Sequence, residues 1–274
     1  MGSQNTRREI RDSRLETRYP FTLPPQPSSM SDADGTGAWV SLFSGGKDSA
    51  WALYQALETG LNVQRLVTVH PSDDSYMYHV PATDLATLAA ESTGIELVNV
   101  DPDDFEADSA TDAGEQGDAE LEPLEAALRE LDADLDGGIA GVTAGAVESE
   151  FQTNRIEAMC DRLGCDLFAP LWQEDPRTLA DDMLDAGFEI KIIQTAAYGL
   201  DESWLGRTLD HDALAELESL NEEYGVHILG EGGEFETLVV DGPHMDQRIG
   251  LEYETEWDSA GTRGTIHVTD ATLE

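Results

Sequence analysis

The sequence contains little lysine, little cysteine and no long apolar run, and each shortage excludes a class of protein. Its 274 residues include two lysines, Lys47 and Lys191, and two cysteines. So few cysteines exclude the disulfide framework of a small secreted domain and fit a reducing compartment, so we expect a cytoplasmic protein. No apolar run approaches the roughly 18 residues that a membrane-spanning helix needs, so we expect no membrane association.

The charge is strongly one-sided. Fifty-seven acidic residues against fifteen lysines and arginines give a net charge of −42, yet 40% of the residues are hydrophobic, enough for a folded core. In molar salt the Debye length falls to about 3 Å, so dense surface carboxylates no longer repel one another over distance. We therefore favour adaptation to high salt; an acidic face for a basic partner is the alternative. The shortage of basic residues also argues against a nucleic-acid partner.

Residues 1–37 differ from the rest in composition. Five arginines are followed by four prolines, with no apolar run that would indicate a signal peptide. We predict a disordered, basic and proline-rich tail, and Met30 is an alternative start to Met1. A basic arm for nucleic acid is the other interpretation, but no aromatic residue is interleaved with the arginines as a stacking platform.

The stretch from Trp39 to Tyr54 changes from a strand pattern to a helix pattern across a short turn. An apolar run ends at Phe43, and an apolar stripe at helical spacing begins at Ala50. Glycines in such a turn, together with the N-terminus of the helix, can direct N–H groups toward an anion. The turn therefore predicts a phosphate site made by Ser44, Gly45, Gly46, Lys47, Asp48 and Ser49. It does not match the Walker pattern, and an ordinary glycine-rich turn is the alternative.

The following segments continue the alternation of strands and helices. Strands are expected at 63–70, 96–100, 137–142 and 166–172, and helices at 81–93, around 121–131 and at 154–163. This order predicts an α/β fold with a parallel sheet, helices on both faces and ligands at the carboxyl ends of the strands. We expect 38–174 to form one nucleotide-binding domain, interrupted at 101–120 by a flexible acidic insert with nine Asp or Glu residues and no Lys or Arg.

Two further segments are candidates for the walls of the pocket. Ser75-Tyr-Met-Tyr-His79 follows the second expected strand, and its alternative role is a solvated loop. In the stretch Gly141–Arg155, the loop backbone could approach the nucleotide and the arginine could reach a phosphate, although a surface arginine is more often only solvated. Cys165 would lie about 140° from the core residue Cys160 around a continued helix, and we expect Gly164 to end the helix first, so we expect no redox pair.

Residues 175–274 leave the regular alternation and predict a smaller C-terminal α+β domain. Helices are expected at 178–186 and 211–223, and a strand at 189–194. The acidic, glycine-containing stretch from Gly230 to Pro243 could be a surface hairpin, or its carboxylates could bind Mg²⁺ or a positively charged substrate.

Four separated motifs then resemble one family in the same order. They are Leu42-Phe-Ser-Gly-Gly-Lys-Asp-Ser49, Ser75-Tyr-Met-Tyr-His79, Phe151-Gln-Thr-Asn-Arg-Ile-Glu157 and Glu231-Gly-Gly-Glu-Phe-Glu-Thr237 with Asp241-Gly-Pro243. Together they resemble the diphthine-ammonia ligase (diphthamide synthase) family of PP-loop ATP pyrophosphatases. The resemblance implies a Rossmann-like sheet of the adenine nucleotide alpha hydrolase type. It also implies that ATP and ammonia amidate diphthine on elongation factor 2 to diphthamide, with release of AMP and pyrophosphate.

The resemblance also implies roles for individual residues. Lys47 and Asp48 would be catalytic, Asp48 would hold Mg²⁺ or orient the loop, and ATP would be bound by Ser44, Gly45, Gly46, Lys47, Asp48, Ser49, Gly141 and Arg155. The substrate would be bound by Tyr78, His79, Glu231, Gly232, Gly233, Glu234, Glu236 and Thr237. A PP-loop enzyme that modifies tRNA and a non-catalytic ATP sensor are the alternatives, and a homodimer is one hypothesis for the oligomeric state.

Overall fold

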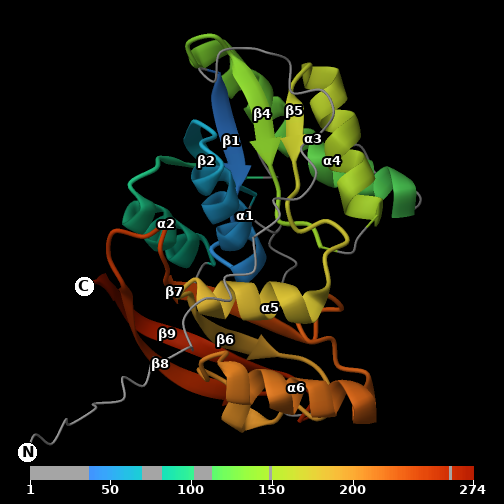
Figure 1. The fold of residues 1–274 in the computed structure, drawn as a ribbon, viewed down its shortest axis with the longest axis vertical. Helices are drawn as coiled ribbons and strands as arrows, with labels where there is room; N and C mark the ends of the chain where they lie inside the picture. The colour runs from blue at the N-terminus through green and yellow to red at the C-terminus, as the bar shows by residue number, and fades with distance from the viewer. Residues whose placement is uncertain (1–36, 70–81, 102–112, 148–149, 259–260) are drawn as a thin grey trace, which may run out of the picture. The chain divides into compact units, whose positions relative to one another are not determined.

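The N-terminal part of the described chain forms a five-stranded parallel sheet. The computed structural model describes residues 37–69, 82–101, 113–147, 150–258 and 261–274. The strands are β1 (Ala38–Leu42), β2 (Val63–Val69), β3 (Leu97–Val100), β4 (Ile139–Thr143) and β5 (Asp166–Phe168). Their order is β3-β2-β1-β4-β5, and every neighbouring pair is parallel (Figure 1). This confirms the expected Rossmann-like sheet.

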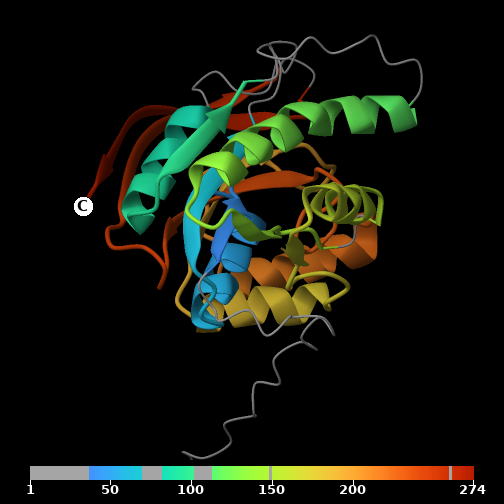
Figure 2. The same ribbon diagram turned by 90° about the horizontal axis from the view of Figure 1, so that it is seen from above.

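Helices cover both faces of this sheet because alternate side chains of each strand point in opposite directions. The helices are α1 (Lys47–Glu58), α2 (Ala82–Thr93), α3 (Ala113–Asp134) and α4 (Glu150–Leu163). Trp39 of β1 belongs to the core cluster that contains α1 and α2, whereas Val40 belongs to the cluster that contains α3 and α4 (Figure 2). Burial on both faces explains the nearly continuous apolar runs of the strands. None of the helices in the described ranges is long and apolar enough to cross a membrane.

The C-terminal part forms a four-stranded antiparallel sheet with two helices. Its strands are β6 (Glu189–Thr195), β7 (Phe235–Asp241), β8 (Ile249–Trp257) and β9 (Gly264–Leu273), in the order β7-β6-β9-β8. The helices α5 (Pro176–Asp185) and α6 (His211–Tyr224) are each capped by an aspartate that accepts a backbone hydrogen bond. This arrangement confirms the α+β character expected for the C-terminal part.

The two sheets meet through α1 and α2. Helix α1 contacts β7, and α2 contacts β8 and β9, so one apolar cluster runs from Trp51 on α1 to Val239 on β7. The backbone N–H of Val239 donates to the carbonyl oxygen of Gly45 (2.9 Å), and the N–H of Lys47 donates to Thr237 Oγ1 (3.2 Å). Strand β7 therefore holds the turn between β1 and α1 in place.

Three expected boundaries differ from the structure by at least four residues. Helix α3 begins at Ala113, so the expected acidic insert is shorter than 101–120; Ala, Glu and Gln fill five of the eight positions 113–120 and favour a helix. Residues 102–112 lie outside the described ranges. Strand β5 ends at Phe168 rather than at Trp172, because Pro170 has no N–H for a sheet hydrogen bond. Helix α4 already begins at Glu150.

Helix α4 ends before Gly164 as expected, but the two cysteines lie together rather than apart. The interaction of the Cys160 thiol with Cys165, together with burial, raises the pKa of Cys160. The reason is the end of α4, where Gly164 takes a positive φ of 72° and the N–H of Cys165 donates to the carbonyl oxygen of Cys160 (3.1 Å). This Schellman geometry folds the residue after the glycine back onto the last turn of the helix. Both cysteines are free thiols.

Candidate active site

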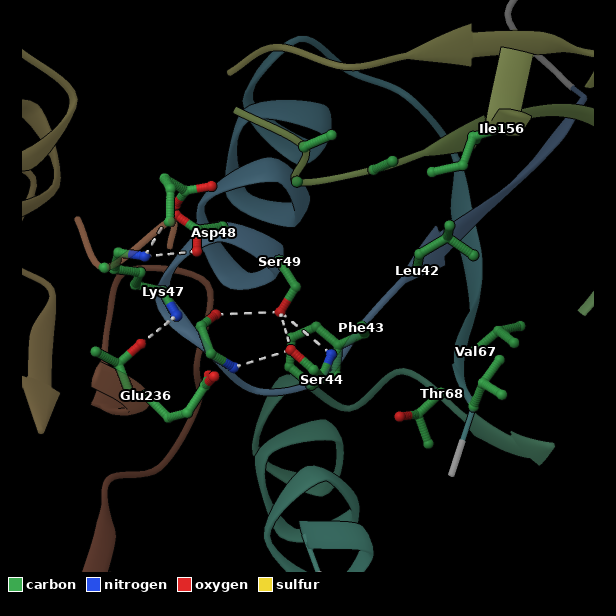
Figure 3. Close-up of a pocket in the computed structure, with 18 of the residues that line it drawn as sticks. Leu42, Phe43, Ser44, Lys47, Asp48, Ser49, Val67, Thr68, Ile156 and Glu236 are labelled. Atoms are coloured by element: carbon green, nitrogen blue, oxygen red, sulfur yellow. Dashed lines mark hydrogen bonds and ion pairs between the residues drawn. The ribbon is translucent and has the colours of Figure 1, made fainter. Parts of the chain in front are cut away.

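The turn between β1 and α1 forms one wall of a pocket of about 500 Å³. The pocket lies at the carboxyl ends of β1, β2 and β4, where ligands bind in sheets of this kind (Figure 3). A second wall, next to the turn, comes from β7 and the segment that leads into it. From the predicted residues the pocket collects Ser44, Gly46, Lys47, Asp48, Ser49, Glu231, Gly233, Glu236 and Thr237.

The turn is preorganised by its own hydroxyl groups. The N–H of Ser44 donates to Ser49 Oγ (3.2 Å), and Ser49 Oγ donates to the carbonyl oxygen of Gly46 (3.1 Å). Gly45 has a φ of 80°, which favours glycine, while Gly46 caps α1 without any side-chain hydrogen bond to the helix. The helix N-terminus thus keeps backbone donors and the positive end of its dipole toward the pocket, as an anion site requires.

Lys47 is the charged centre of the pocket. The residue is only 4% exposed, and its Nζ lies 2.6 Å from Asp48 Oδ2 and 3.5 Å from Glu231 Oε1. Burial alone would lower the pKa of Lys47, but the two carboxylates outweigh it, and the pKa is raised. The lysine therefore stays protonated and offers a positive charge with little water around it, where electrostatic interactions are stronger than in bulk solvent.

Glu236 lies near this lysine in the same pocket (Figure 3). It is largely buried; burial raises the pKa of its carboxyl group, with a further increase from Asp48 and an opposing influence from Lys47. Two acidic side chains from the segment around β7, Glu231 and Glu236, thus face a lysine from the start of α1.

Gly145 is a pocket residue that the sequence analysis did not single out. A Cβ atom at this position would lie 2.6 Å from the carbonyl carbon and oxygen of Asp48 and 2.8 Å from the N–H nitrogen of Ser49. Only glycine fits so close to the first turn of α1. The signal was present as the second glycine of the stretch from Gly141 to Arg155, but the close approach itself depends on tertiary structure. Thr68, Ala146 and Ile156 also line the pocket.

Three candidate nucleotide residues do not line this pocket. Gly141 lies inside β4, where an added Cβ would come within 2.4 Å of the Trp39 ring, so packing on the neighbouring strand explains this glycine. Arg155 lies on α4, and its neighbour Ile156 is the residue that reaches the pocket. The candidate Gly45 is also absent from the lining, and its carbonyl oxygen instead accepts the hydrogen bond from Val239.

Some of the predicted substrate residues line the pocket and others do not. The Glu234 carboxylate turns back to its own segment, where it accepts hydrogen bonds from the N–H of His227 (3.0 Å) and the N–H of Gly232 (2.8 Å). Glu234 and Gly232 therefore shape the approach to β7 and do not line the pocket. Tyr78 and His79 lie outside the described residues.

We expect Gly145→Ala to weaken nucleotide binding by about ten-fold or more, because the new methyl group displaces the start of α1, and to cost about 1–3 kcal/mol of stability, as overpacking does. Isothermal titration with ATP and thermal unfolding measure the two effects. Gly60→Ala is the matched control, since nothing lies within 4 Å of its new Cβ and only the positive φ of 83° is unfavourable. Equal ATP affinity in both variants would contradict the assigned close approach.

The described residues contain no group of three or more His, Cys, Asp or Glu side chains arranged to hold a metal ion. Asp48 Oδ2, the candidate ligand for Mg²⁺, is within 2.6 Å of Lys47 Nζ. Mg²⁺ usually takes only one or two carboxylates and otherwise binds water and substrate phosphates. The residues present therefore fit a magnesium ion held mainly by the phosphates of a bound nucleotide.

A Rossmann-like sheet with a strand–turn–helix phosphate site at its carboxyl edge defines an α/β nucleotide-binding protein. Family models described as the diphthamide synthase N-terminal domain and C-terminal domain match residues 37–167 and 175–273. The chain belongs to the diphthamide synthase family.

Several curated relatives are named diphthine–ammonia ligase. The one from Danio rerio is 33% identical over 245 residues, covering 85% of this chain and 90% of the relative. The Homo sapiens relative is 32% identical, covering 77% and 81%. The Schizosaccharomyces pombe relative is 34% identical, and the matched region is only 36% of its length. A crystal structure titled as a predicted subunit of tRNA methyltransferase from Methanocaldococcus jannaschii covers 75% of this chain and 98% of its own, at 17% identity and a TM-score of 0.40, too low to bear on function.

Proposed function

We propose that the protein uses ATP and ammonia to convert the carboxylate of diphthine on elongation factor 2 into the amide of diphthamide. The observation that carries this proposal is the buried Lys47 at a preorganised phosphate turn, in a chain of the diphthamide synthase family. The names of the relatives supply the amide-forming reaction. The proposal also places the protein in the cytoplasm, where the acceptor works in translation.

Amide formation sets the demands on the site. A carboxylate has no good leaving group, so it must first be activated; we propose attack on the α-phosphorus of ATP to give an acyl-adenylate and pyrophosphate, followed by attack of ammonia that releases AMP. Ser44, Gly46 and Ser49 would hold the departing pyrophosphate at the N-terminus of α1. Lys47 would offset the charge that grows on this group as the bond breaks.

The carboxylates beside Lys47 would have separate tasks. Asp48 would orient the lysine and the loop through Oδ2, which lies 2.6 Å from Lys47 Nζ. Its Oδ1, which is buried without a hydrogen-bond partner among the described residues, would be the atom that could hold Mg²⁺. Mg²⁺ would then enter with the phosphates of ATP. Glu231, Gly233 and Thr237, which line the pocket beside the phosphate turn, would face the acceptor and its cationic trimethylammonium group.

The proposal also assigns a role to each part of the chain. Residues 38–174 would bind the nucleotide, and 175–274 would supply the acceptor side of the pocket. Gly141, Arg155, Tyr78 and His79 remain predicted ligands. Adaptation to high salt and a homodimer also remain predictions.

A reaction in high potassium chloride tests the function. The protein is incubated with ATP, magnesium, ammonium labelled with the heavy nitrogen isotope, and elongation factor 2 carrying diphthine. We expect one AMP for each labelled amide found by mass spectrometry of the factor. AMP without an amide would favour another acceptor, including a tRNA, and ATP binding without any AMP would favour the sensor.

A further inference from the structure

Glu236 is a largely buried carboxylate that the fold does not use. Within the described part of the chain its carboxylate makes no hydrogen bond and no ion pair, although its side chain lines the pocket. A carboxylate that is partly withdrawn from water, has a raised pKa and lines a pocket without an ion pair is a candidate for contact with a ligand.

The neighbouring charges define what this ligand can be. Lys47 is the nearby cation, and it is paired with Asp48 and Glu231. One lysine and three carboxylates leave an excess of two negative charges at this end of the pocket. The residue opposite Glu236 on β6 is Gln194, whose side chain is neutral. The carboxylates therefore suit a small cation that donates hydrogen bonds, whereas the backbone N–H groups of the neighbouring phosphate turn suit an anion.

We propose that Glu236 binds ammonium, the second substrate, and removes one of its protons to generate the ammonia that attacks the activated carboxylate. The inference rests on the proposed function and assigns a site for its nitrogen source. At neutral pH almost all ammonia is present as ammonium, because nitrogen bases of this type have pKa values well above 7. Ammonium has no lone pair and cannot attack a carbonyl carbon, so an enzyme that uses it needs both a binding group and a base.

Ammonium gives one proton to the Glu236 carboxylate, leaving neutral ammonia and a carboxylic acid. The nitrogen lone pair forms a bond to the acyl carbon, and the bond from that carbon to the phosphate oxygen breaks with its electron pair. The nitrogen loses a further proton to the departing phosphate oxygen, which leaves as AMP. Glu236 returns its proton to solvent through the open side of the pocket.

The surroundings of Glu236 favour this role. Burial is the main cause of the raised pKa of the Glu236 carboxyl group. Lys47 lowers this pKa and Asp48 raises it further. Glu231 pairs with the same lysine. A carboxylate with a raised pKa is a stronger base than an exposed glutamate, and a base is most effective when its pKa lies near the working pH. Glu236 is thus better suited to accept a proton than Asp48 or Glu231, which pair with Lys47.

Substitution Glu236→Gln, compared with two nucleophiles, tests the proposal. The amide keeps the size of the side chain but cannot accept the proton, so we expect kcat/KM for ammonium to fall about 10²-fold, the lower end for loss of a general base. Hydroxylamine is mostly unprotonated at neutral pH and needs no such base, so hydroxamate formation should stay within about three-fold of the wild type. The rate of the variant with ammonium should rise with pH as free ammonia increases.

Glu252→Gln on the exposed face of β8 is the matched control, and it should behave as wild type with both nucleophiles. Thermal unfolding and ATP titration check that the Glu236 variant is folded and binds nucleotide. Unchanged ammonium kinetics in that variant, or equal losses with ammonium and hydroxylamine, would overturn the ammonium site while leaving the ligase reaction intact. A wild type that forms neither amide nor hydroxamate would remove the proposed function and this inference together.

Discussion

Replacing Lys47 with alanine should lower the rate of AMP formation by about 10²-fold or more, the loss seen when one preorganised catalytic donor is removed. The Lys47 ammonium group is held in the pocket by Asp48 and Glu231, and the residue is 4% exposed. Water therefore cannot replace the ammonium group without rearrangement of the pocket. The substitution also leaves two partly buried carboxylates without their cation, so a lower melting temperature is expected as well. Single-turnover measurement of AMP at saturating ATP separates the catalytic loss from weaker binding.

The chain supplies its own control for this experiment. The other lysine, Lys191, lies on β6 and donates a hydrogen bond to Thr208 Oγ1 (2.8 Å). Lys191→Ala removes the same charge from the second sheet, outside the pocket, and should leave AMP formation within about two-fold of the wild type. Normal turnover in Lys47→Ala would remove the proposed role of this lysine.

Stability should rise steeply with salt, because the chain has a net charge of −42. Two like charges about 10 Å apart repel by about 0.4 kcal/mol in water without salt, so about ten such pairs remove about 4 kcal/mol. A domain usually has only about 5–15 kcal/mol of stability, so this repulsion is a large part of the total. Molar potassium chloride shortens the Debye length to about 3 Å and removes most of the repulsion.

Thermal unfolding followed by circular dichroism, from about 0.01 M to molar potassium chloride, checks this expectation. The melting temperature should rise most in the low-salt range, where the screening length changes most, and then level off. A melting temperature that is flat or falls over the range would contradict adaptation to high salt and favour an acidic face that needs a basic partner.

The parallel sheet was predictable from local pattern, and the second sheet was only partly so. Strands β1, β2 and β4 are buried on both faces, which gives short apolar runs that the sequence displays directly. Strand β8 is largely exposed, with acidic residues at Glu252, Glu254 and Glu256, and the sequence analysis assigned neither it nor β9. Strand β9 pairs with the preceding strand β8, from Ile249 with Leu273 to Trp257 with Gly264, but it joins the rest of the sheet through the distant strand β6.

In the candidate site too, residues that are continuous in sequence were predictable, whereas contacts between distant segments were not. The turn from Ser44 to Ser49 is continuous in sequence, and its residues were expected together. The contact of Lys47 with Glu231 joins residues that are 184 positions apart, and the need for glycine at position 145 comes from the backbone of Asp48. Contacts of this kind exist only once β7 and the β4–α4 loop have packed against α1, so spacing in the sequence could not reveal them.

The fate of the carboxylate oxygen tests the central claim most directly. Elongation factor 2 carrying diphthine labelled with a heavy oxygen isotope in its carboxylate is allowed to react with ATP and ammonium. If this site activates the carboxylate at the α-phosphorus, one labelled oxygen should appear in AMP for each amide formed. Label in inorganic phosphate with release of ADP, or an amide formed without any transfer of label, would contradict the account.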